Sequence, residues 1–491
     1  MGAYAIAAII AIVIYMAFSL AVGLGLGYKK EVVSTSRGYF IGTGTQNFIL
    51  FFTTVATWFS TGLYQGVVGS LYKNGIGWIG ISTWQLLVVS CMGVFGPRFW
   101  KLSKSHNFVT PAQLVSDYYQ SKGFKLIIAV GMLAFCIPSM MAQIRGVSWA
   151  INAITDNAIS FNMAIVIVAI IVGIYVYFGG FNSQAWVDTA QGLLFIVVLW
   201  GCLFIVAGVN GGWTESWRRL AESAPDVLFY KDTSQYWSWR RYISFFFIQG
   251  LGGFFAPYVW QRTYAAKSSR DCRKLAGYMG AFFCFAVCLP VVFCGLNMHV
   301  AMPAMENPEN GLVTFMAEYA PGWAIFVSLG ILAAGMSTIS SILVTCSSIL
   351  AVDIGETIRP DAGDDKVRQW GRMLVLAILL IGVVMSFMTI QTIEILINLT
   401  LAGFAQMVIP VLGIFVFKRM TKAGACAGYL AGLVVSALGT ITWNNPLGFM
   451  GGAWGFLANI VICIAVSAVT KPVSEEHRAA FLAPLKTPDQ D

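Results

Sequence analysis

A group of hydroxyl side chains lies close together within an otherwise apolar stretch of the chain. The group consists of Ser337, Thr338, Ser340 and Ser341, in the segment AAGMSTISS of the run FVSLGILAAGMSTISSILVTCSSILAV. If this run is a helix, Ala334, Ser337 and Thr338 lie at positions i, i+3 and i+4 and share one face. Hydroxyl oxygens, completed by carbonyls of an interrupted helix, can bind a hard monovalent cation. The alternative is that these hydroxyls bond only to carbonyls of their own helix.

Two charged side chains also lie within apolar stretches. Asp188 occurs in GGFNSQAWVDTAQG, and Arg145 occurs in MMAQIRGVSWA. A charge at the centre of a bilayer costs at least about 2.5–3.5 kcal/mol, so its side chain must face the protein interior and have a partner. The planar guanidinium of Arg145 suits a carboxylate, either of a bound solute or of an internal structural pair. Asp188 indicates an ion pathway if it lies within the membrane, or an interfacial position if its helix begins nearby.

Further polar and aromatic residues of the apolar stretches are candidates to line a solute cavity. They are Trp58, Ser60, Thr61, Tyr64, Gln65, Gln85, Gln143, Gln249 and Gln406. Uncharged amides and hydroxyls beside aromatic rings are typical of small-solute sites. Each residue taken alone is also compatible with helix packing or interhelical hydrogen bonding.

Long apolar helices must position these residues. Of the 491 residues, 58% are hydrophobic and 11% are charged, whereas about 25% are charged in soluble domains. The apolar stretches are about 20 residues long, enough to cross roughly 30 Å of hydrocarbon as a helix, and they lack the alternation of barrel strands. We expect an all-α membrane protein with about thirteen transmembrane helices. The expected spans are 3–27, 45–71, 76–100, 124–155, 161–180, 185–208, 239–261, 274–300, 322–352, 369–388, 391–416, 424–442 and 450–470.

Two of these spans contain sequences that would interrupt a helix. Span 45–71 contains the polar cluster TTVATWFSTG, and span 239–261 contains GLGGFFAP. Unwound backbone is tolerated in a membrane only where it faces protein or a cavity. Two broken helices at matching positions of two halves therefore indicate a transporter site. The alternative is that the glycines only permit close helix packing.

An inverted repeat would explain this match, because two successive units with an odd number of spans have opposite orientations. The expected organisation is a first helix and joint at 1–44, a first unit at 45–208, an outer segment at 209–238, a second unit at 239–416, and C-terminal helices with a short tail at 417–491. We expect the polar tail, residues 471–491, to be disordered.

Basic residues gather at alternate joints between the spans and indicate an orientation. Because basic joints stay in the cytoplasm, the N-terminus is predicted outside and the C-terminus inside. One joint assigned to the cytoplasm contains Arg262, Lys267 and Arg270. The net charge of +8 follows from these joints and does not indicate nucleic-acid binding. We expect a multi-pass protein of the plasma membrane, specifically of a bacterial inner membrane.

The sequence does not predict an enzyme. It lacks the metalloprotease pattern HExxH, the nucleotide-binding pattern GxxxxGK[ST] and the nucleophile pattern GxSxG. The 10 cysteines lie mostly in apolar spans without CxxC spacing, and we interpret them as packing residues.

Three segments carry a resemblance to a known family. GGFNSQAWVDTAQG, WQRTYAAKS and LAAGMSTISSILVTCSSILAVDI resemble the sodium:solute symporter family, which includes proline and pantothenate permeases, sodium/sugar transporters and bacterial sialic acid transporters. The resemblance extends over nearly the whole chain. It implies a five-plus-five inverted-repeat core, sodium as the coupled ion, and uptake by alternating access.

The resemblance also implies ligands at specific positions. For the sodium site they are the carbonyls of Ala56, Phe59 and Ala334 and the hydroxyls of Ser337 and Thr338. For a second sodium site, as in sialic acid transporters, they are Asp188, Ser340 and Ser341. Asp188 would otherwise serve as a relay for sodium exit.

For the solute, the family resemblance points to Arg145. The helix that carries it lines the substrate cavity in this family, and an arginine on that helix binds the substrate carboxylate in sialic acid transporters. Trp58 stands where proline permeases have an aspartate, and Ala256 stands where sugar transporters have an asparagine. These two departures argue against proline and against sugars.

The sequence therefore predicts a sodium-coupled secondary symporter that imports a small organic solute, expected to be a carboxylate-bearing anion. A neutral or zwitterionic solute, such as an amino acid, is the alternative. A channel or a solute sensor on the same fold is the alternative from another class. The expected partners are sodium ions, the solute and the lipid bilayer, with neither nucleic acid nor an obligate protein partner.

Overall fold

The computed structural model describes residues 2–42, 44–229, 238–388 and 392–487, and the secondary structure of these residues is entirely helical. The α-helices are α1 (Ala3–Ala21), α2 (Ser36–Ile41), α3 (Asn47–Trp58), α4 (Val68–Asn74), α5 (Gly80–His106), α6 (Pro111–Tyr118), α7 (Lys122–Ile154), α8 (Phe161–Val209), α9 (Trp213–Ser223), α10 (Trp239–Phe255), α11 (Pro257–Ala265), α12 (Ser269–Phe282), α13 (Leu289–Ala301), α14 (Gly311–Tyr319), α15 (Pro321–Ser348), α16 (Glu356–Ile358), α17 (Asp364–Met388), α18 (Ile393–Ala405), α19 (Val408–Phe415), α20 (Lys422–Ile441), α21 (Gly451–Val469) and α22 (Glu475–Leu482). Turns with π-helical geometry continue four of them: η1 (Val22–Gly27), η3 (Gly62–Val67), η6 (Phe283–Cys288) and η8 (Ile349–Gly355).

The long helices are sufficiently apolar and long to cross a membrane. Within the described residues, 9 helices meet both criteria, or 10 if the bent pair α10 and α11 forms one span. The predicted pair 161–180 and 185–208 appears as the single helix α8, divided by a kink at Gly180, where φ is 54° and ψ is −142°. The count of about thirteen spans stays a prediction. Residue 391, where one predicted span begins, and residues 230–237 of the predicted outer segment lie outside the described residues.

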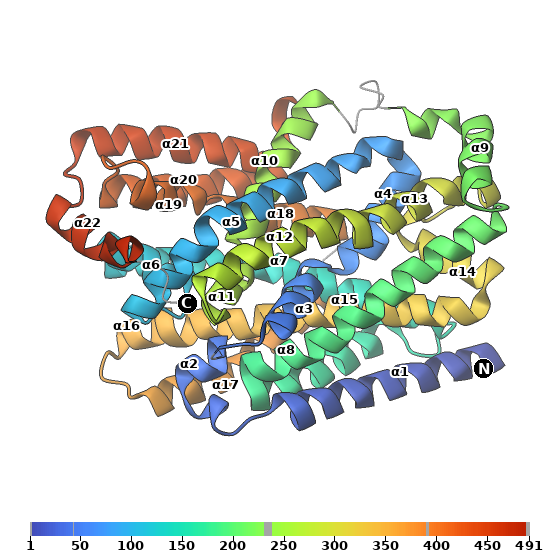
Figure 1. Ribbon diagram of the computed structural model, residues 1–491, viewed down its shortest axis with the longest axis horizontal. Helices are drawn as coiled ribbons and strands as arrows, with labels where there is room; N and C mark the ends of the chain where they lie inside the picture. Colours follow the sequence, from blue (N-terminus) through green and yellow to red (C-terminus); the bar gives the residue numbers. More distant parts are fainter. Residues whose placement is uncertain (1, 43, 230–237, 389–391, 488–491) are drawn as a thin grey trace.

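The long helices lie side by side along the longest axis of the molecule (Figure 1). Helices α9 and α14 lie near the end where α1 begins, whereas α2, α6, α16 and α22 lie near the opposite end. Because α1 begins at one end and α22 lies near the other, the arrangement is compatible with the odd number of crossings that the sequence predicts.

Both predicted helix interruptions are confirmed. Helix α3 ends at Trp58, and Phe59 has extended backbone angles of φ −85° and ψ 91° before η3 begins at Gly62. Helix α10 ends before Ala256, whose φ is −57° and ψ is 128°, and α11 then continues at a bend of 46°. Pro257 explains the second break, because proline has no N–H to donate and disfavours helical angles at the residue before it.

Helix α15 is the centre of the bundle. Its membrane-crossing part is buried throughout, and it packs against α8, α7 and α3. Gly335 permits one of these contacts, because a Cβ atom there would collide with side-chain atoms of Val147 on α7 and Thr61 beside η3. The hydroxyl-bearing turn of α15 is thereby held directly against the break in α3.

Two expectations from the sequence are wrong. The C-terminal tail is helical in part, because α22 buries Phe481, which stacks on His106 at a ring-centroid distance of 4.9 Å. Arg262, expected at a cytoplasmic joint, lies within α11 with only 1% of its surface exposed. Phe481 packs the tail against the bundle, and internal oxygen atoms hold Arg262 inside the protein.

Candidate functional site

The break in α3 leaves carbonyl groups that the hydroxyl pair of α15 satisfies. The last carbonyls of a helix have no partner within it. Ser337 Oγ lies 2.8 Å from the Ala56 carbonyl and 2.9 Å from the Ala334 carbonyl. Thr338 Oγ1 lies 3.2 Å from the Thr57 carbonyl and 3.1 Å from the Ala334 carbonyl. The hydroxyls thus have partners both within their own helix and across to the broken one.

Four of the five predicted sodium ligands therefore come together, namely Ala56, Ala334, Ser337 and Thr338. The Thr57 carbonyl belongs to the same set of oxygen atoms, and it was not predicted from the sequence. Phe59 lies in the break itself, where its N–H donates to the Val55 carbonyl at 3.0 Å and its buried ring packs against Phe195 and Phe283. The result is a compact set of oxygen atoms at the point where a membrane helix is interrupted.

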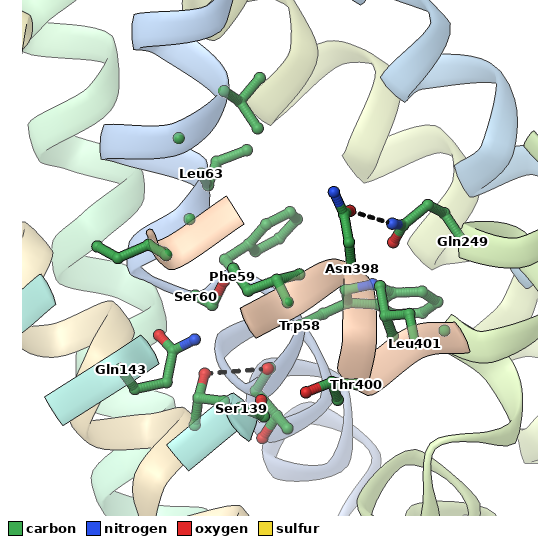
Figure 2. Close-up of a pocket in the computed structure, with 18 of the residues that line it drawn as sticks. Trp58, Phe59, Ser60, Leu63, Ser139, Gln143, Gln249, Asn398, Thr400 and Leu401 are labelled. Carbon is green, nitrogen blue, oxygen red and sulfur yellow. Dashed lines mark hydrogen bonds between the residues drawn. The ribbon is translucent and has the colours of Figure 1, made fainter. Parts of the chain in front are cut away.

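A cavity of about 130 Å³ lies beside these oxygens. The break after α3, together with α5, α7, α10 and α18, forms its walls (Figure 2). Its polar and aromatic lining comprises Thr57, Trp58, Phe59, Ser60, Trp84, Gln85, Ser139, Gln143, Phe245, Gln249, Tyr258, Phe283, Thr338, Glu394, Asn398 and Thr400. Thr338 belongs both to the oxygen set and to the cavity lining, so the two features are contiguous.

Half of the predicted solute residues line this cavity: Trp58, Ser60, Gln85, Gln143 and Gln249. Two further predicted residues, Thr61 and Gln65, do not line the cavity but form hydrogen bonds with α7, which carries part of the lining. The Thr61 N–H and hydroxyl both donate to Gln143 Oε1 at 2.9 Å, and the Gln65 amide lies 3.4 Å from the Gly146 carbonyl. Tyr64 donates to the Phe195 carbonyl at 2.5 Å.

Gln406 and Arg145 lie elsewhere. The Gln406 amide donates to Ser436 Oγ at 3.0 Å and fastens α18 to α20, one of the C-terminal helices. The Arg145 guanidinium donates to the Ser386 carbonyl at 3.0 Å and lies over the Phe161 ring at 5.4 Å. Arg145 therefore contacts α17 and α8 and is not among the residues that line the cavity.

The sequence interpretation missed several lining residues. Gln249 donates to Asn398 Oδ1 at 2.6 Å, as Figure 2 shows, and Glu394 one turn earlier on α18 pairs with Arg241 at 3.1 Å. Trp84 lines the cavity, and its indole N–H has no partner among the described residues. Glu394 and Asn398 stand at positions i and i+4, on one helix face within an apolar run, and this spacing was the available signal.

The predicted second ion set also comes together, but around an arginine. Asp188 is fully buried, and Thr53 donates to its Oδ2 at 2.6 Å. Ser340 Oγ lies 3.5 Å from Asp188 Oδ1, and the Arg262 guanidinium lies 3.3 Å from Oδ2. The sequence indicated Asp188 but gave Arg262 a different position.

An acidic turn lies close to the cavity, outside the membrane-spanning helices. Glu309 belongs to η7 (Pro308–Asn310), and the neighbouring Asn310 accepts a bond from Gln65 of η3 at 3.4 Å. Burial raises the pKa of Glu309 above its ordinary value, and repulsion by Glu394 raises it further. The negative charges of Glu309 and Glu394 therefore repel one another.

Comparison with known proteins places these features in a family. A model of the sodium:solute symporter family matches residues 39–432. The sodium/pantothenate symporter of Haemophilus influenzae is 24% identical over 439 residues, which cover 87% of this chain and 88% of that protein. The sodium/proline symporter of Staphylococcus aureus is 26% identical over 486 residues, which cover 94% of this chain and 92% of that protein.

Solved structures share the fold. A substrate-bound, outward-open Na⁺-coupled sialic acid symporter aligns with a TM-score of 0.80 and 18% identity, covering 95% of this chain and 99% of the other. The structure of MhsT in complex with L-phenylalanine aligns with a TM-score of 0.54 and 12% identity, covering 87% of this chain. The matched family consists of multi-pass membrane transporters that couple a solute to sodium, and not of enzymes. With the model matching residues 39–432, the chain belongs to the sodium:solute symporter family.

Proposed function

We propose that this chain imports a small carboxylate-bearing solute together with sodium, by alternating access. The observation that carries the proposal is the contact between the hydroxyls of α15 and the carbonyls at the α3 break. Thr338 belongs to this contact and also lines the cavity. A sodium ion bound there would lie beside the solute, so that each would favour binding of the other.

The sodium ligands we propose are the carbonyls of Ala56, Phe59 and Ala334 and the hydroxyls of Ser337 and Thr338. Sodium would replace the hydrogen bonds that now join the hydroxyls to the carbonyls, and the hydroxyl oxygens would then face the ion. Because the oxygens come from both α3 and α15, sodium would hold the broken helix against the central one. Solute binding to the same broken helix would then depend on the ion.

The cavity indicates the size of the solute. A volume of about 130 Å³ is close to that of the engineered apolar cavity of about 150 Å³ that binds benzene. A carboxylic acid of a few carbon atoms would fit this space, whereas a larger solute would require the walls to move. Trp58 and Trp84, whose ring centroids are 6.5 Å apart, would contact its apolar part.

Among the described lining residues, no positive side chain is available to a carboxylate. Within the described lining residues the only charged group is Glu394, which pairs with Arg241. The positive charge for an anion would therefore come from the bound sodium, and hydrogen bonds would come from amides such as Gln85. Glu394 specifically favours a second candidate, a small zwitterion, whose ammonium group it would attract.

We further propose that residues 45–208 and 239–416 are the two inverted units that move relative to one another during transport. From the basic joints we infer an N-terminus outside and a C-terminus inside, in a bacterial inner membrane. No obligate protein partner is part of this proposal.

Proteoliposomes test the proposal directly. Purified protein would be reconstituted with a sodium gradient directed inward or with an equal potassium gradient, and uptake would be measured for labelled short carboxylates, small amino acids, proline, pantothenate and sialic acid. We expect sodium-dependent uptake of a short carboxylate or a small amino acid. Uptake that is equal in sodium and potassium would contradict sodium coupling, and uptake restricted to pantothenate or sialic acid would contradict the proposed size.

A further inference from the structure

A groove on the outside of the helix bundle lies between α3 and α12. Its volume is about 710 Å³, several times that of the engineered cavity of about 150 Å³ that holds one benzene molecule. Phe48, Tyr278 and Phe285 line it with exposed fractions of 59%, 62% and 73%. Because α12 begins an apolar span long enough to cross a membrane, these exposed rings face hydrocarbon, and the groove has room for an acyl chain.

One end of the groove is polar. Asn47, at the start of α3, donates to Asp271 Oδ1 of α12 at 2.9 Å, and Ser268 donates to Asp271 Oδ2 at 2.8 Å. Each oxygen of this carboxylate therefore already has a donor from the protein. Lys274, on the next turn of α12, is exposed and also lines the groove. The groove thus combines apolar walls with a positive side chain near the start of both helices.

The segment that leads into α12 is strongly basic. Lys267, Arg270, Arg273 and Lys274 lie within eight residues, and Asp271 is the only acidic residue among them. All four basic side chains are exposed, in a joint that we infer to be cytoplasmic. Four or more Lys or Arg residues on the cytoplasmic side of a membrane helix attract anionic lipids, and basic pockets between membrane helices bind their head groups.

A second groove on the bundle shows that this combination is not general. It lies between α8 and α17, has a volume of about 560 Å³, and is lined by apolar residues and Tyr177. None of its described lining residues is charged. Both grooves can accommodate apolar chains, but only the one between α3 and α12 offers a positive charge to a phosphate.

We propose that the groove between α3 and α12 binds one anionic phospholipid, with an acyl chain along its apolar walls and the phosphate beside Lys274. Phe51 of α3 and Phe282 of α12, whose ring centroids are 5.2 Å apart, both line the groove. The lipid would therefore contact the first half of the broken helix and α12 together. This site is separate from the proposed solute cavity, and its occupation does not depend on sodium.

Photocrosslinking tests the site in the full chain. The protein would be reconstituted without sodium into phosphatidylcholine bilayers that contain a trace of phosphatidylglycerol with a photoreactive acyl chain, and the modified peptides would be mapped. We expect more adducts on α3 and α12 than on α8 and α17, whose groove serves as the internal control. Unlabelled phosphatidylglycerol should remove this excess, and additional phosphatidylcholine should not.

Variants test the charge and the space separately. One Lys or Arg near an anionic surface changes lipid binding by about fivefold, so Lys274→Gln should lower the yield at the groove by about that factor, whereas Lys274→Arg should retain it. Lys30→Gln is the matched control, because Lys30 is an exposed lysine outside the groove lining. Ala281→Trp should also lower the yield, because Ala281 is exposed and lines the groove, and its replacement fills the space without a change of charge.

Three results would overturn the inference. Equal yields at the two grooves of the unaltered protein would do so without reference to any variant. Equal competition by phosphatidylcholine would show that the groove takes any bilayer lipid. Unchanged yields in folded Lys274→Gln and Ala281→Trp would show that the lipid lies elsewhere. Since no sodium is present, each of these results leaves the proposed sodium-coupled function intact, and failure of that function leaves the lipid site intact.

Discussion

Ser337 and Thr338 illustrate how a local helix interruption creates the ligand set that we propose for sodium. Water is absent from the bilayer core, so an unpaired carbonyl there costs several kcal/mol. The chain meets this requirement at the end of α3 with two hydroxyls from α15. Because these hydrogen bonds can be exchanged for an ion, the same atoms satisfy the backbone in the absence of sodium and would bind sodium when it is present.

Arg145 can be tested separately from the cavity. Its guanidinium contacts the Ser386 carbonyl and the Phe161 ring. We therefore expect Arg145→Gln to lower the melting temperature but to change solute affinity by less than about twofold, well below the tenfold change that about 1.4 kcal/mol produces. Solute titration of the variant measures this. A loss of affinity of tenfold or more at normal protein yield would support the sequence-based assignment of Arg145 to the solute carboxylate.

Trp84, unlike Arg145, is expected to contact the solute directly. Its indole N–H has no partner among the described residues, and its ring lines the cavity. A hydrogen bond to a charged group contributes about 1.5–3 kcal/mol, so Trp84→Phe should weaken carboxylate binding by about tenfold or more. Trp454→Phe is the control, because the Trp454 N–H donates to the Pro446 carbonyl, outside the cavity lining. Equal affinities for both variants would exclude Trp84 as a solute ligand.

At the residue scale, the sequence was most informative where residue type and helical spacing indicated the same site. Ser337 and Thr338 stand one helical turn from Ala334, and the structure joins all three. It was least informative for single polar residues, because Gln143 lines the cavity whereas Gln406 fastens two helices, and their local sequences do not distinguish them. Arg262 was misplaced because its partners lie on three other elements.

Among the elements, the contact of α15 with α7 is the most sensitive to side-chain size. A Cβ atom at Gly335 would collide with Val147 and Thr61, and overpacking costs about 1–3 kcal/mol. We expect Gly335→Ala to lower the melting temperature and to weaken sodium binding, since Thr61 adjoins the break. Gly322→Ala on the same helix has open space around its Cβ and should change neither quantity. Identical behaviour of the two variants would contradict this account of the contact.

The acidic turn η7 should make sodium binding depend on pH. Glu309 has a pKa above its ordinary value, so its negative charge is present above that raised pKa and is lost as the pH falls through it. Two unit charges about 4 Å apart in water interact by about 1 kcal/mol, and less at a greater distance. We therefore expect sodium affinity to fall by about two- to threefold as the pH falls through the raised pKa of Glu309, and to fall less in Glu309→Gln. An unchanged pH profile in this variant would assign the effect to another group.

The long helices and both breaks followed directly from the sequence, since apolar length predicts a span and a proline or a polar cluster predicts an interruption. Helix α22 did not, because a short polar segment becomes ordered only through a distant contact such as Phe481 on His106. The kink in α8 was predicted only as a boundary between two spans, and its geometry at Gly180 depends on the packing of Tyr39 against that glycine.

For the whole molecule, the number of sodium ions determines whether the membrane potential drives transport. One positive charge moved through 100 mV corresponds to about 2.3 kcal/mol. If one sodium accompanies a monovalent anion, no net charge moves and uptake should not respond to the potential. If one sodium accompanies a zwitterion, one charge moves and an inside-negative potential should accelerate uptake. Uptake with an imposed potassium diffusion potential therefore distinguishes the two solute candidates.

The central claim is that sodium binds where α15 meets the break in α3, and it is most directly tested by the melting temperature of purified protein as sodium replaces potassium at constant ionic strength. A ligand that binds only the folded state stabilises it by RT ln(1 + [L]/Kd). We predict a saturable rise for the unaltered protein and for Ser347→Ala, whose buried hydroxyl donates to the Val344 carbonyl of its own helix. We predict no rise for Ser337→Ala/Thr338→Ala. A sodium-specific rise that persists in this double variant, or that is absent from the unaltered protein, would contradict the claim.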